Sequence, residues 1–253
     1  MLKGKIALVT GATSGIGRAT AEVFAKNGLK VIICGRRQEK LEEVANYLRG
    51  FTEIKTLQFD VRNQQEVKTS IESLEGEWKN IDILVNNAGN AHGLDPIQTG
   101  KISDWDAMID INVKGLLYVS ESVIPSMTSR NTGHIVNIGS IAGKQVYANG
   151  NVYCASKFAV DALTQGMRID LNHYGIRVTQ VAPGLVETEF SVVRFKGDEE
   201  KAKKVYQGYE PLKAEDIADS IWYAVNAPKH VQIADLVILP TAQAAATIVN
   251  RKS

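Results

Sequence analysis

Cysteine is nearly absent from this sequence, and so are long apolar runs. The two cysteines among 253 residues, Cys34 and Cys154, are too few for a disulfide framework, although the sequence does not exclude a single disulfide between them. No apolar run approaches the length of a membrane-spanning helix. The first run, Ile6–Val9, is too short for a secretory signal and leads straight into a glycine turn. We therefore expect a cytoplasmic protein with no membrane partner.

An excess of charge of one sign is also missing. The formal net charge is +1, whereas proteins that bind nucleic acids or acidic membranes usually carry a basic excess. The sequence has no cluster of His, Cys, Asp and Glu at metal-ligand spacing. We expect a small-molecule substrate, no nucleic-acid partner and no metal.

The sequence does contain a regular alternation of short apolar runs and stretches with helical spacing. This alternation is typical of repeated βαβ units, which form a parallel sheet with helices on both faces. No linker or internal repeat interrupts the pattern. We predict an α/β fold: one Rossmann-type doubly wound parallel sheet of seven strands in a single domain, residues 1–253. The seven runs are Ile6–Val9, Lys30–Cys34, Lys55–Phe59, Asp82–Val85, His134–Ile138, Arg177–Val181 and Leu236–Leu239.

One stretch departs from this rhythm. Residues 183–211 are irregular and rich in charge, and they follow the sixth predicted strand. Ligands of open α/β sheets bind at the carboxyl ends of the strands, and a long connection there is usually functional. We predict a substrate lid at about residues 185–211; a solvated surface excursion is the alternative.

The first predicted strand runs into a glycine-rich turn that opens a helical stretch. Glycines let the backbone approach a pyrophosphate, and the free N–H groups of the following helix attract the phosphates. A glycine cluster in this position predicts a dinucleotide-binding site, with a purely structural turn as the alternative. The predicted cofactor residues in the turn are Gly11, Thr13, Ser14, Gly15, Ile16 and Gly17.

The end of the second predicted strand favours NADP over NAD. NAD-binding proteins usually carry an acidic residue here for the ribose 2′-hydroxyl. This chain has Arg36 and Arg37 instead, and guanidinium groups attract a 2′-phosphate. In the alternative interpretation the two arginines simply begin a solvated helix.

The ends of the third and fourth predicted strands add further cofactor candidates. Asp60, followed by Val61, could accept a hydrogen bond from the adenine amino group, or could be a common turn residue. Asn87, Ala88 and Gly89 follow the fourth strand, where small residues let the backbone pass close to the cofactor. An ordinary asparagine–glycine turn is the alternative there.

Tyr153 and Lys157 are the central catalytic candidates. They lie four positions apart in a predicted helix over residues 152–171, so both side chains share one face. An ammonium nearby lowers the pKa of a phenol, which lets tyrosine exchange a proton while hydride moves to or from a nicotinamide. Ser140, at the end of the fifth strand, could hold the substrate oxygen. Asn112, in a helical pattern over residues 105–127, could bind a backbone group or a water linked to Lys157.

Together these motifs resemble the short-chain dehydrogenase/reductase family over the whole chain. The resemblance implies that Asn112, Ser140, Tyr153 and Lys157 form a catalytic tetrad, and that Lys157 also bonds the nicotinamide ribose. It implies further that four residues hold the nicotinamide carboxamide: Pro183, Gly184, Val186 and Thr188. One position departs from the NADP-preferring pattern, because Ser14 stands where many members carry a basic residue.

The stretches around residues 139–143, 153–160 and 183–200 resemble one branch in particular, the NADP-dependent 3-hydroxy acid (serine or allo-threonine) dehydrogenases. This branch implies oxidation of the 3-hydroxyl of L-allo-threonine, L-serine or 3-hydroxyisobutyrate. One alternative is a reductase of other carbonyls, of the 3-oxoacyl carrier-protein or sugar type. A non-catalytic NADP sensor is a second, although such a protein would not need Ser140, Tyr153 and Lys157 together.

A carboxylate substrate requires a cation beside the cavity. Lys144, Arg194 and Lys196 are the candidates, each with solvated surface charge as the alternative. His92 could also line the cavity. The family usually forms tetramers, so the resemblance implies a homotetramer; the apolar C-terminal run from Leu236 to Ile248 could take part in its contacts or pack within the chain.

Overall fold

A seven-stranded parallel sheet forms the centre of the molecule. The computed structural model describes residues 2–252. The strand order is β3-β2-β1-β4-β5-β6-β7, and every neighbouring pair is parallel. The prediction of seven strands is confirmed, with bounds that agree to within two residues. The strands are β1 (Ile6–Val9), β2 (Lys30–Gly35), β3 (Ile54–Gln58), β4 (Ile83–Asn86), β5 (Gly133–Ile138), β6 (Ile176–Pro183) and β7 (Asp235–Ile238).

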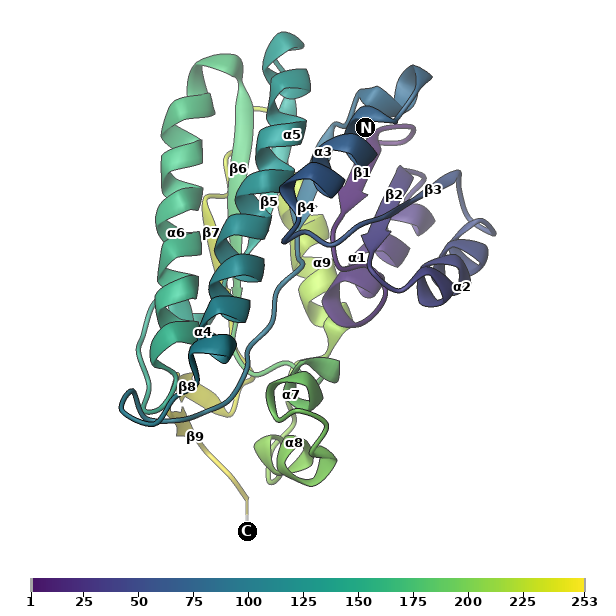
Figure 1. Ribbon diagram of the computed structural model, residues 1–253. Helices are drawn as coiled ribbons and strands as arrows, with labels where there is room; N and C mark the ends of the chain where they lie inside the picture. The colour runs from purple at the N-terminus through teal and green to yellow at the C-terminus, as the bar shows by residue number, and fades with distance from the viewer. Residues whose placement is uncertain (1, 253) are drawn as a thin grey trace.

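Helices cover both faces of this sheet, which explains why the central strands β1 and β4 are buried at every position (Figure 1). The edge strands β3 and β7 alternate instead. In β1, Ile6 and Leu8 pack with side chains of α3, α5 and α6, whereas Ala7 and Val9 pack with those of α1, α2 and α9. The helices are α1 (Gly15–Lys26), α2 (Gln38–Leu48), α3 (Gln64–Glu72), α4 (Ile102–Ile109), α5 (Gly115–Ser129), α6 (Asn151–Leu171), α7 (Glu189–Arg194), α8 (Glu199–Val205) and α9 (Ala214–Val225).

The strand order reverses between β1 and β4. The chain proceeds from β1 to β2 and β3 on one side, then crosses back to β4 and continues outward to β7. In open α/β sheets the crevice at such a reversal, at the carboxyl ends of the strands, is where ligands bind. The turns that leave β1 and β4 therefore flank the expected cofactor position.

Residues 183–211 were predicted to be irregular, but they contain the two short helices α7 and α8. Figure 1 shows both helices below the lower end of the sheet, which is the end where the chain passes from β1 into α1. The C-terminal residues form a small antiparallel pair, β8 (Gln243–Ala245) and β9 (Ile248–Val249), that the sequence did not predict.

The helical pattern predicted over residues 105–127 is split in the structure. Helix α4 passes through a π-helical turn, Asp110–Lys114, before α5 begins. Such turns insert an extra residue and are frequent at functional sites. Here the turn contains Asn112.

The disulfide that the sequence left open does not form. Cys34 and Cys154 are both free and buried. Between residues 2 and 252, no helix has both the length and the apolar composition needed to cross a membrane. The same residues contain no group of three or more His, Cys, Asp or Glu side chains placed to hold a metal ion.

Candidate active site

A cavity of about 540 Å³ lies at the carboxyl ends of the strands. Its walls come from the glycine turn, the end of β2, the loop after β4, the start of α6, the turn after β6, and α7. Most of the predicted site residues line it, including Ser140, Tyr153 and Lys157. The predicted residues outside its lining are Gly17, Asp60, His92, Asn112, Lys144 and Lys196.

The glycine turn has the geometry of a phosphate-binding turn. Gly11 has a φ of +64°, a region that favours glycine, and α1 begins at Gly15 with its first N–H groups beside the cavity. Gly17 has a different role. A Cβ there would lie 2.4 Å from Asn87 Nδ2 and 2.5 Å from the Gly11 carbonyl oxygen. Gly17 is thus required for the close packing of α1 against the strand ends rather than for contact with a ligand.

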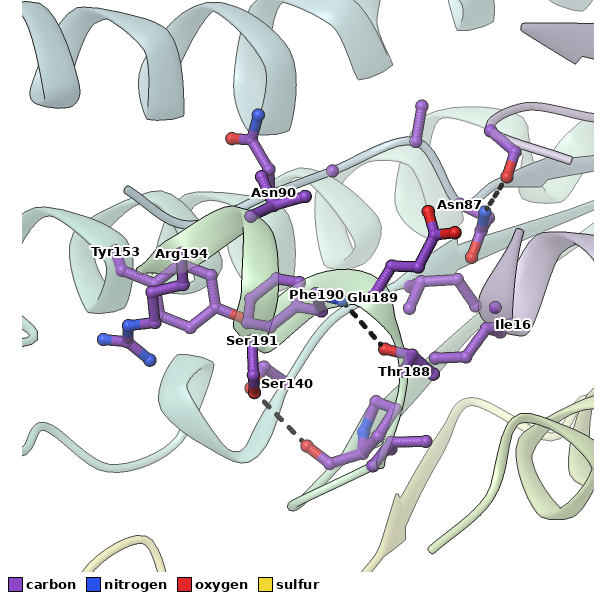
Figure 2. Close-up of a pocket in the computed structure, with 18 of the residues that line it drawn as sticks. Ile16, Asn87, Asn90, Ser140, Tyr153, Thr188, Glu189, Phe190, Ser191 and Arg194 are labelled. Carbon is purple, nitrogen blue, oxygen red and sulfur yellow. Dashed lines mark hydrogen bonds between the residues drawn. The ribbon is translucent and has the colours of Figure 1, made fainter. Parts of the chain in front are cut away.

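Hydrogen bonds join the loop after β4 to the glycine turn. The Asn87 side-chain amide donates to the Thr10 carbonyl at 2.8 Å and to the Gly11 carbonyl at 3.3 Å, the second of which Figure 2 marks. The backbone N–H groups of Asn87 and Ala88 both donate to the buried Thr10 hydroxyl at 3.0 Å. The start of this loop is therefore fixed against the glycine turn.

The carboxylate of Asp60, predicted to bind adenine, pairs with arginines instead. Its carboxylate accepts hydrogen bonds from Arg62, the shortest 2.6 Å, and lies 3.5 Å from Arg36 Nη1. Burial acts to raise the Asp60 pKa, but the hydrogen bonds and charge of Arg62 outweigh it and hold the pKa below its usual value. The structure therefore does not place Asp60 on the cavity, whereas its neighbour Val61 does line it.

Arg36 and Arg37 both line the cavity, as predicted for groups that face a 2′-phosphate. Arg37 lies directly before α2, and its guanidinium donates to the Thr13 hydroxyl at 3.2 Å. The Glu189 carboxylate, on α7, is 3.5 Å from Arg37 and 3.4 Å from Lys40. At the basic end of the cavity, α7 is thus joined to the start of α2 through an acidic residue, Glu189, that the sequence analysis did not single out.

Tyr153 and Lys157 share the buried face of α6, as their spacing predicted. Ser140 lies opposite them and begins the short 3-10 turn Ile141–Gly143. Its hydroxyl accepts the Ala142 N–H at 3.1 Å and donates to the Pro183 carbonyl at 3.5 Å. Ser140 also lies close enough to Tyr153 to lower the pKa of its hydroxyl. The two hydroxyls that would hold a substrate oxygen therefore lie together.

Lys157 and Asn112 are held by the backbone. The Lys157 ammonium donates to the Ile138 carbonyl at 2.9 Å. The Asn112 amide pairs with the Asn90 backbone in both directions, each bond 2.9 Å, and donates to the Ser156 hydroxyl at 3.0 Å. Asn112 therefore connects the loop after β4 to α6, which fits the predicted bond to a backbone group.

Burial dominates the protonation of the two central groups. It raises the Tyr153 pKa above that of a free phenol, although the Ser140 hydrogen bond and the Arg194 charge act in the opposite direction. Burial lowers the Lys157 pKa to about 8. The expectation that Lys157 lowers the tyrosine pKa is therefore not met in this arrangement, because desolvation has the largest effect. A phenol in this state is a proton donor to a carbonyl oxygen.

Three aromatic and cationic side chains close the catalytic end of the cavity. The ring of Phe190 lies 5.8 Å from that of Tyr153, tilted by 60°. The Arg194 guanidinium lies 5.4 Å from the Tyr153 ring and 5.6 Å from the Tyr147 ring, and it donates to the Tyr147 hydroxyl at 3.0 Å. Figure 2 shows Arg194 and Phe190 reaching Tyr153 from the 185–211 segment. Sequence reasoning missed Tyr147, which stands in no motif, and did not single out Phe190 within the stretch 183–200.

Of the three predicted cations, only Arg194 lines the cavity. Lys144 turns to Asp161, at 2.6 Å, and to Asp235. Lys196 forms an ion pair with Asp104 at 2.8 Å. Both ammonium groups are thus engaged by carboxylates outside the cavity.

His92 does not line this cavity; it borders a separate, much smaller one. Burial lowers its pKa.

The C-terminal segment supplies a residue that no motif indicated. Gln243 is buried, and its side-chain oxygen accepts the Leu185 N–H at 3.0 Å. A Cβ on Gly184 would lie 2.2 Å from the same oxygen, so only glycine permits this contact. Gln243 therefore holds the turn after β6 that was predicted to bind the nicotinamide carboxamide.

A family model described as short chain dehydrogenase matches residues 5–199. The chain belongs to this family. The match covers the glycine turn, the tyrosine–lysine pair and the turn after β6. The family prediction is thereby confirmed.

Several relatives extend the similarity to the full length of the chain. An NADP-dependent 3-hydroxy acid dehydrogenase, YdfG from Salmonella typhi, is 46% identical over 98% of this chain and 100% of its own. Sulfoacetaldehyde reductase 2 from Chromohalobacter salexigens is 43% identical over 94% of this chain and 95% of its own. The closed form of serine dehydrogenase complexed with NADP⁺ has 46% identity and a TM-score of 0.92, and it covers 98% of this chain and 100% of its own.

Proposed function

We propose that this enzyme moves a hydride between NADP and the 3-hydroxyl or 3-oxo group of small hydroxy acids such as L-allo-threonine, L-serine or 3-hydroxyisobutyrate. The observation that carries the proposal is the position of Arg194 over Tyr153, at 5.4 Å. A guanidinium there can hold a carboxylate while the tyrosine reaches the hydroxyl a few bonds away. The names of the full-length relatives agree with this substrate class.

The residues divide the reaction between them. When bound, the nicotinamide ring accepts or supplies the hydride. During oxidation Tyr153 accepts the substrate hydroxyl proton, and during reduction it returns a proton to the carbonyl oxygen. The Ser140 hydroxyl orients that oxygen, and Lys157 supplies positive charge beside the phenol. Asn112 acts through the backbone it holds, so it is a positioning residue.

The cavity fits a dinucleotide along its length. The N–H groups at the start of α1 face the pyrophosphate position, and Arg36 and Arg37 face the 2′-phosphate position. The residues predicted for the carboxamide line the catalytic end: Pro183, Gly184, Val186 and Thr188. Two arginines and no acidic residue at the end of β2 favour NADP over NAD.

Residues 185–211 act as a substrate lid in this proposal. Phe190 and Arg194 reach Tyr153 from this segment. Two hydrogen bonds join the segment to the loop after β4: the Gly93 N–H donates to the Arg194 carbonyl, and the Arg194 side chain donates to the Gly93 carbonyl. Closure of such a segment excludes water from the hydride-transfer site.

An Arg194→Ala variant tests the substrate contact. Loss of a charge-assisted bond to a carboxylate costs about 1.5–3 kcal/mol, so KM for the acid rises by about 10- to 100-fold. Lys196→Ala is the matched control, because that ammonium pairs with Asp104 outside the cavity. An unchanged KM in Arg194→Ala would remove Arg194 from the substrate site.

The decisive experiment follows nicotinamide absorbance with L-allo-threonine or L-serine and either NADP or NAD. Reduction of NADP with little reduction of NAD supports the proposal. Turnover only with 3-oxoacyl or sugar-type carbonyls would favour the reductase alternative, and sulfoacetaldehyde belongs in the panel because Arg194 would also bind a sulfonate. An enzyme inactive with every substrate would favour the NADP sensor.

The assembly in this proposal is a homotetramer in the cytoplasm. Exposed side chains recur at helical spacing on α6 and include Phe158 and Ile169, which are 41% and 76% exposed. An apolar stripe of this kind is suited to contact with another copy. Light scattering of the wild type and of Ile169→Glu measures the mass, and a monomeric wild type would contradict the proposal.

A further inference from the structure

The Glu189 carboxylate lies among groups suited to bind a phosphate. It is the first residue of α7, in the proposed lid, and it reaches across the cavity to Arg37 at 3.5 Å and Lys40 at 3.4 Å. Ser14 acts in the same direction as these cations and lowers the Glu189 pKa, so its side chain also lies beside the carboxylate. In Figure 2 its carboxylate points away from Tyr153, toward the end of the cavity where Ile16 and Asn87 lie.

These three partners come from two elements expected to contact the adenosine end of NADP. Ser14 belongs to the glycine turn and carries no charge. Arg37 lies directly before α2, and Lys40 lies in the first turn of that helix, whose N-terminus also favours an anion. Ammonium, guanidinium and hydroxyl groups bind a carboxylate and a phosphate through the same kinds of hydrogen bond. Lys40 thus supplies a cation near the position where Ser14 lacks one.

We propose that Lys40 is a third cationic ligand of the 2′-phosphate, and that Glu189 is a lid carboxylate that this phosphate displaces. The inference rests on the proposed placement of the 2′-phosphate at Arg37. The carboxylate and the phosphate are both negative and require the same partners, so they cannot share them without repulsion. NADP therefore releases the start of α7 from α2, whereas NAD, which has a 2′-hydroxyl, leaves the two ion pairs in place.

Cofactor affinity tests the competition directly. NADPH and NADH dissociation constants are measured by nicotinamide fluorescence at low ionic strength. Exposed ion pairs contribute up to about 1 kcal/mol each, so Glu189→Gln is expected to bind NADPH about three- to tenfold more tightly and NADH unchanged. Glu200→Gln on α8 is the matched control. An unchanged or weaker NADPH affinity in Glu189→Gln would overturn the role of Glu189.

Lys40→Gln tests the third ligand. Its NADPH affinity is expected to fall by about fivefold, with NADH affinity unchanged, and the loss should shrink at high salt because the groups are solvent-exposed. Lys68→Gln on α3 is the control for removing one surface lysine. Equal effects on NADPH and NADH would contradict the assignment.

Lid release is measured without the nicotinamide. Amide hydrogen exchange of residues 186–195 is compared in adenosine 2′,5′-bisphosphate and in adenosine 5′-monophosphate. We expect faster exchange with the bisphosphate in the wild type and no difference between the two nucleotides in Glu189→Gln. Equal exchange with both nucleotides in the wild type would contradict coupling between the phosphate and the lid.

Arg37→Gln tests the 2′-phosphate position at Arg37 separately from the roles of Lys40 and Glu189. If Arg37→Gln loses its NADPH preference while the Lys40 and Glu189 variants behave like the wild type, only the further inference fails. If Arg37→Gln also keeps the preference for NADPH, the proposed 2′-phosphate position is wrong.

Discussion

The two sides of the cavity are held in different ways. On the sheet side, the turns after β1 and β4 and the buried face of α6 are joined by hydrogen bonds of buried or half-buried groups, such as those of Thr10 and Lys157. On the lid side, Glu189 at the start of α7 forms ion pairs between half-exposed side chains with Arg37 and Lys40, and Lys196 just after α7 pairs with Asp104. Exposed ion pairs contribute little and are screened by salt, whereas buried bonds are costly to break. The difference suits a fixed catalytic side and a lid that can move.

Replacing Tyr153 with phenylalanine is expected to have the largest effect, and it tests whether chemistry belongs to the sheet side. The variant keeps the ring but loses the proton carrier, so kcat falls by about 10²- to 10⁴-fold. NADPH affinity, measured by fluorescence, should stay within about twofold, since a factor of two is only a few tenths of a kcal/mol. A variant that retains substantial turnover would show that another group carries the proton.

Lys157→Met tests the energetic cost of the buried ammonium. The folded pKa of about 8 lies below the ordinary 10.5, so this group contributes full stability only above pH 10.5 and loses it as the pH falls through 8. Below pH 8 the ammonium is charged in both states and its burial is a penalty of about 3 kcal/mol at most. The inactive variant should therefore be more stable than the wild type at pH 7, with a smaller gap at pH 10. Urea unfolding at both pH values measures this; a gap independent of pH would contradict it.

Gly17→Ala probes the close packing on the sheet side. The added Cβ would meet Asn87 Nδ2 and the Gly11 carbonyl at distances that require the turn to shift. We expect a loss of about 1–3 kcal/mol in the free energy of unfolding, together with weaker cofactor binding. Gly166→Ala in α6 is the matched control: its Cβ would meet no atom within 4 Å, so it should be neutral or stabilising by up to about 1 kcal/mol. Equal effects of the two substitutions would show that the turn is looser than this structure indicates.

Arg251→Ala should have the smallest effect, confined to the lid side. The guanidinium donates to the carbonyls of Val205, at 3.0 Å, and Gln207, and it lies 5.1 Å from the Tyr209 ring. Its loss should raise KM for the acid by about two- to fivefold, the effect of about one solvent-exposed hydrogen bond or less. Hydrogen exchange should quicken at residues 199–209 and stay unchanged in β4 and β5. Lys201→Ala on α8 is the control, and faster exchange in the strands would break the distinction between the two sides.

Much of the sheet side could be predicted from the sequence. The spacing of apolar residues and the turn residues between apolar runs identify strands and helices, because each of these patterns depends on neighbours a few residues away. The turn that contains Gly11 and the pair Tyr153 and Lys157 are local signals of this kind. Once the runs were ordered as βαβ units, the carboxyl ends of the strands had to meet, and the site followed from topology.

The lid side was decided by the tertiary structure. The contact of Phe190 with Tyr153 and the bond from Gln243 to the Leu185 backbone join residues 37 and 58 positions apart, and no local pattern encodes them. The same holds for Lys144 and Lys196, whose charges looked equally available in the sequence until the fold brought Asp161 and Asp104 beside them. Even the pKa of Tyr153 depends mainly on how completely its neighbours exclude water. The sequence by itself thus determined the sheet, the glycine turn and the catalytic helix face through local spacing, whereas long-range packing decided which charges face the cavity and how far the catalytic groups are desolvated.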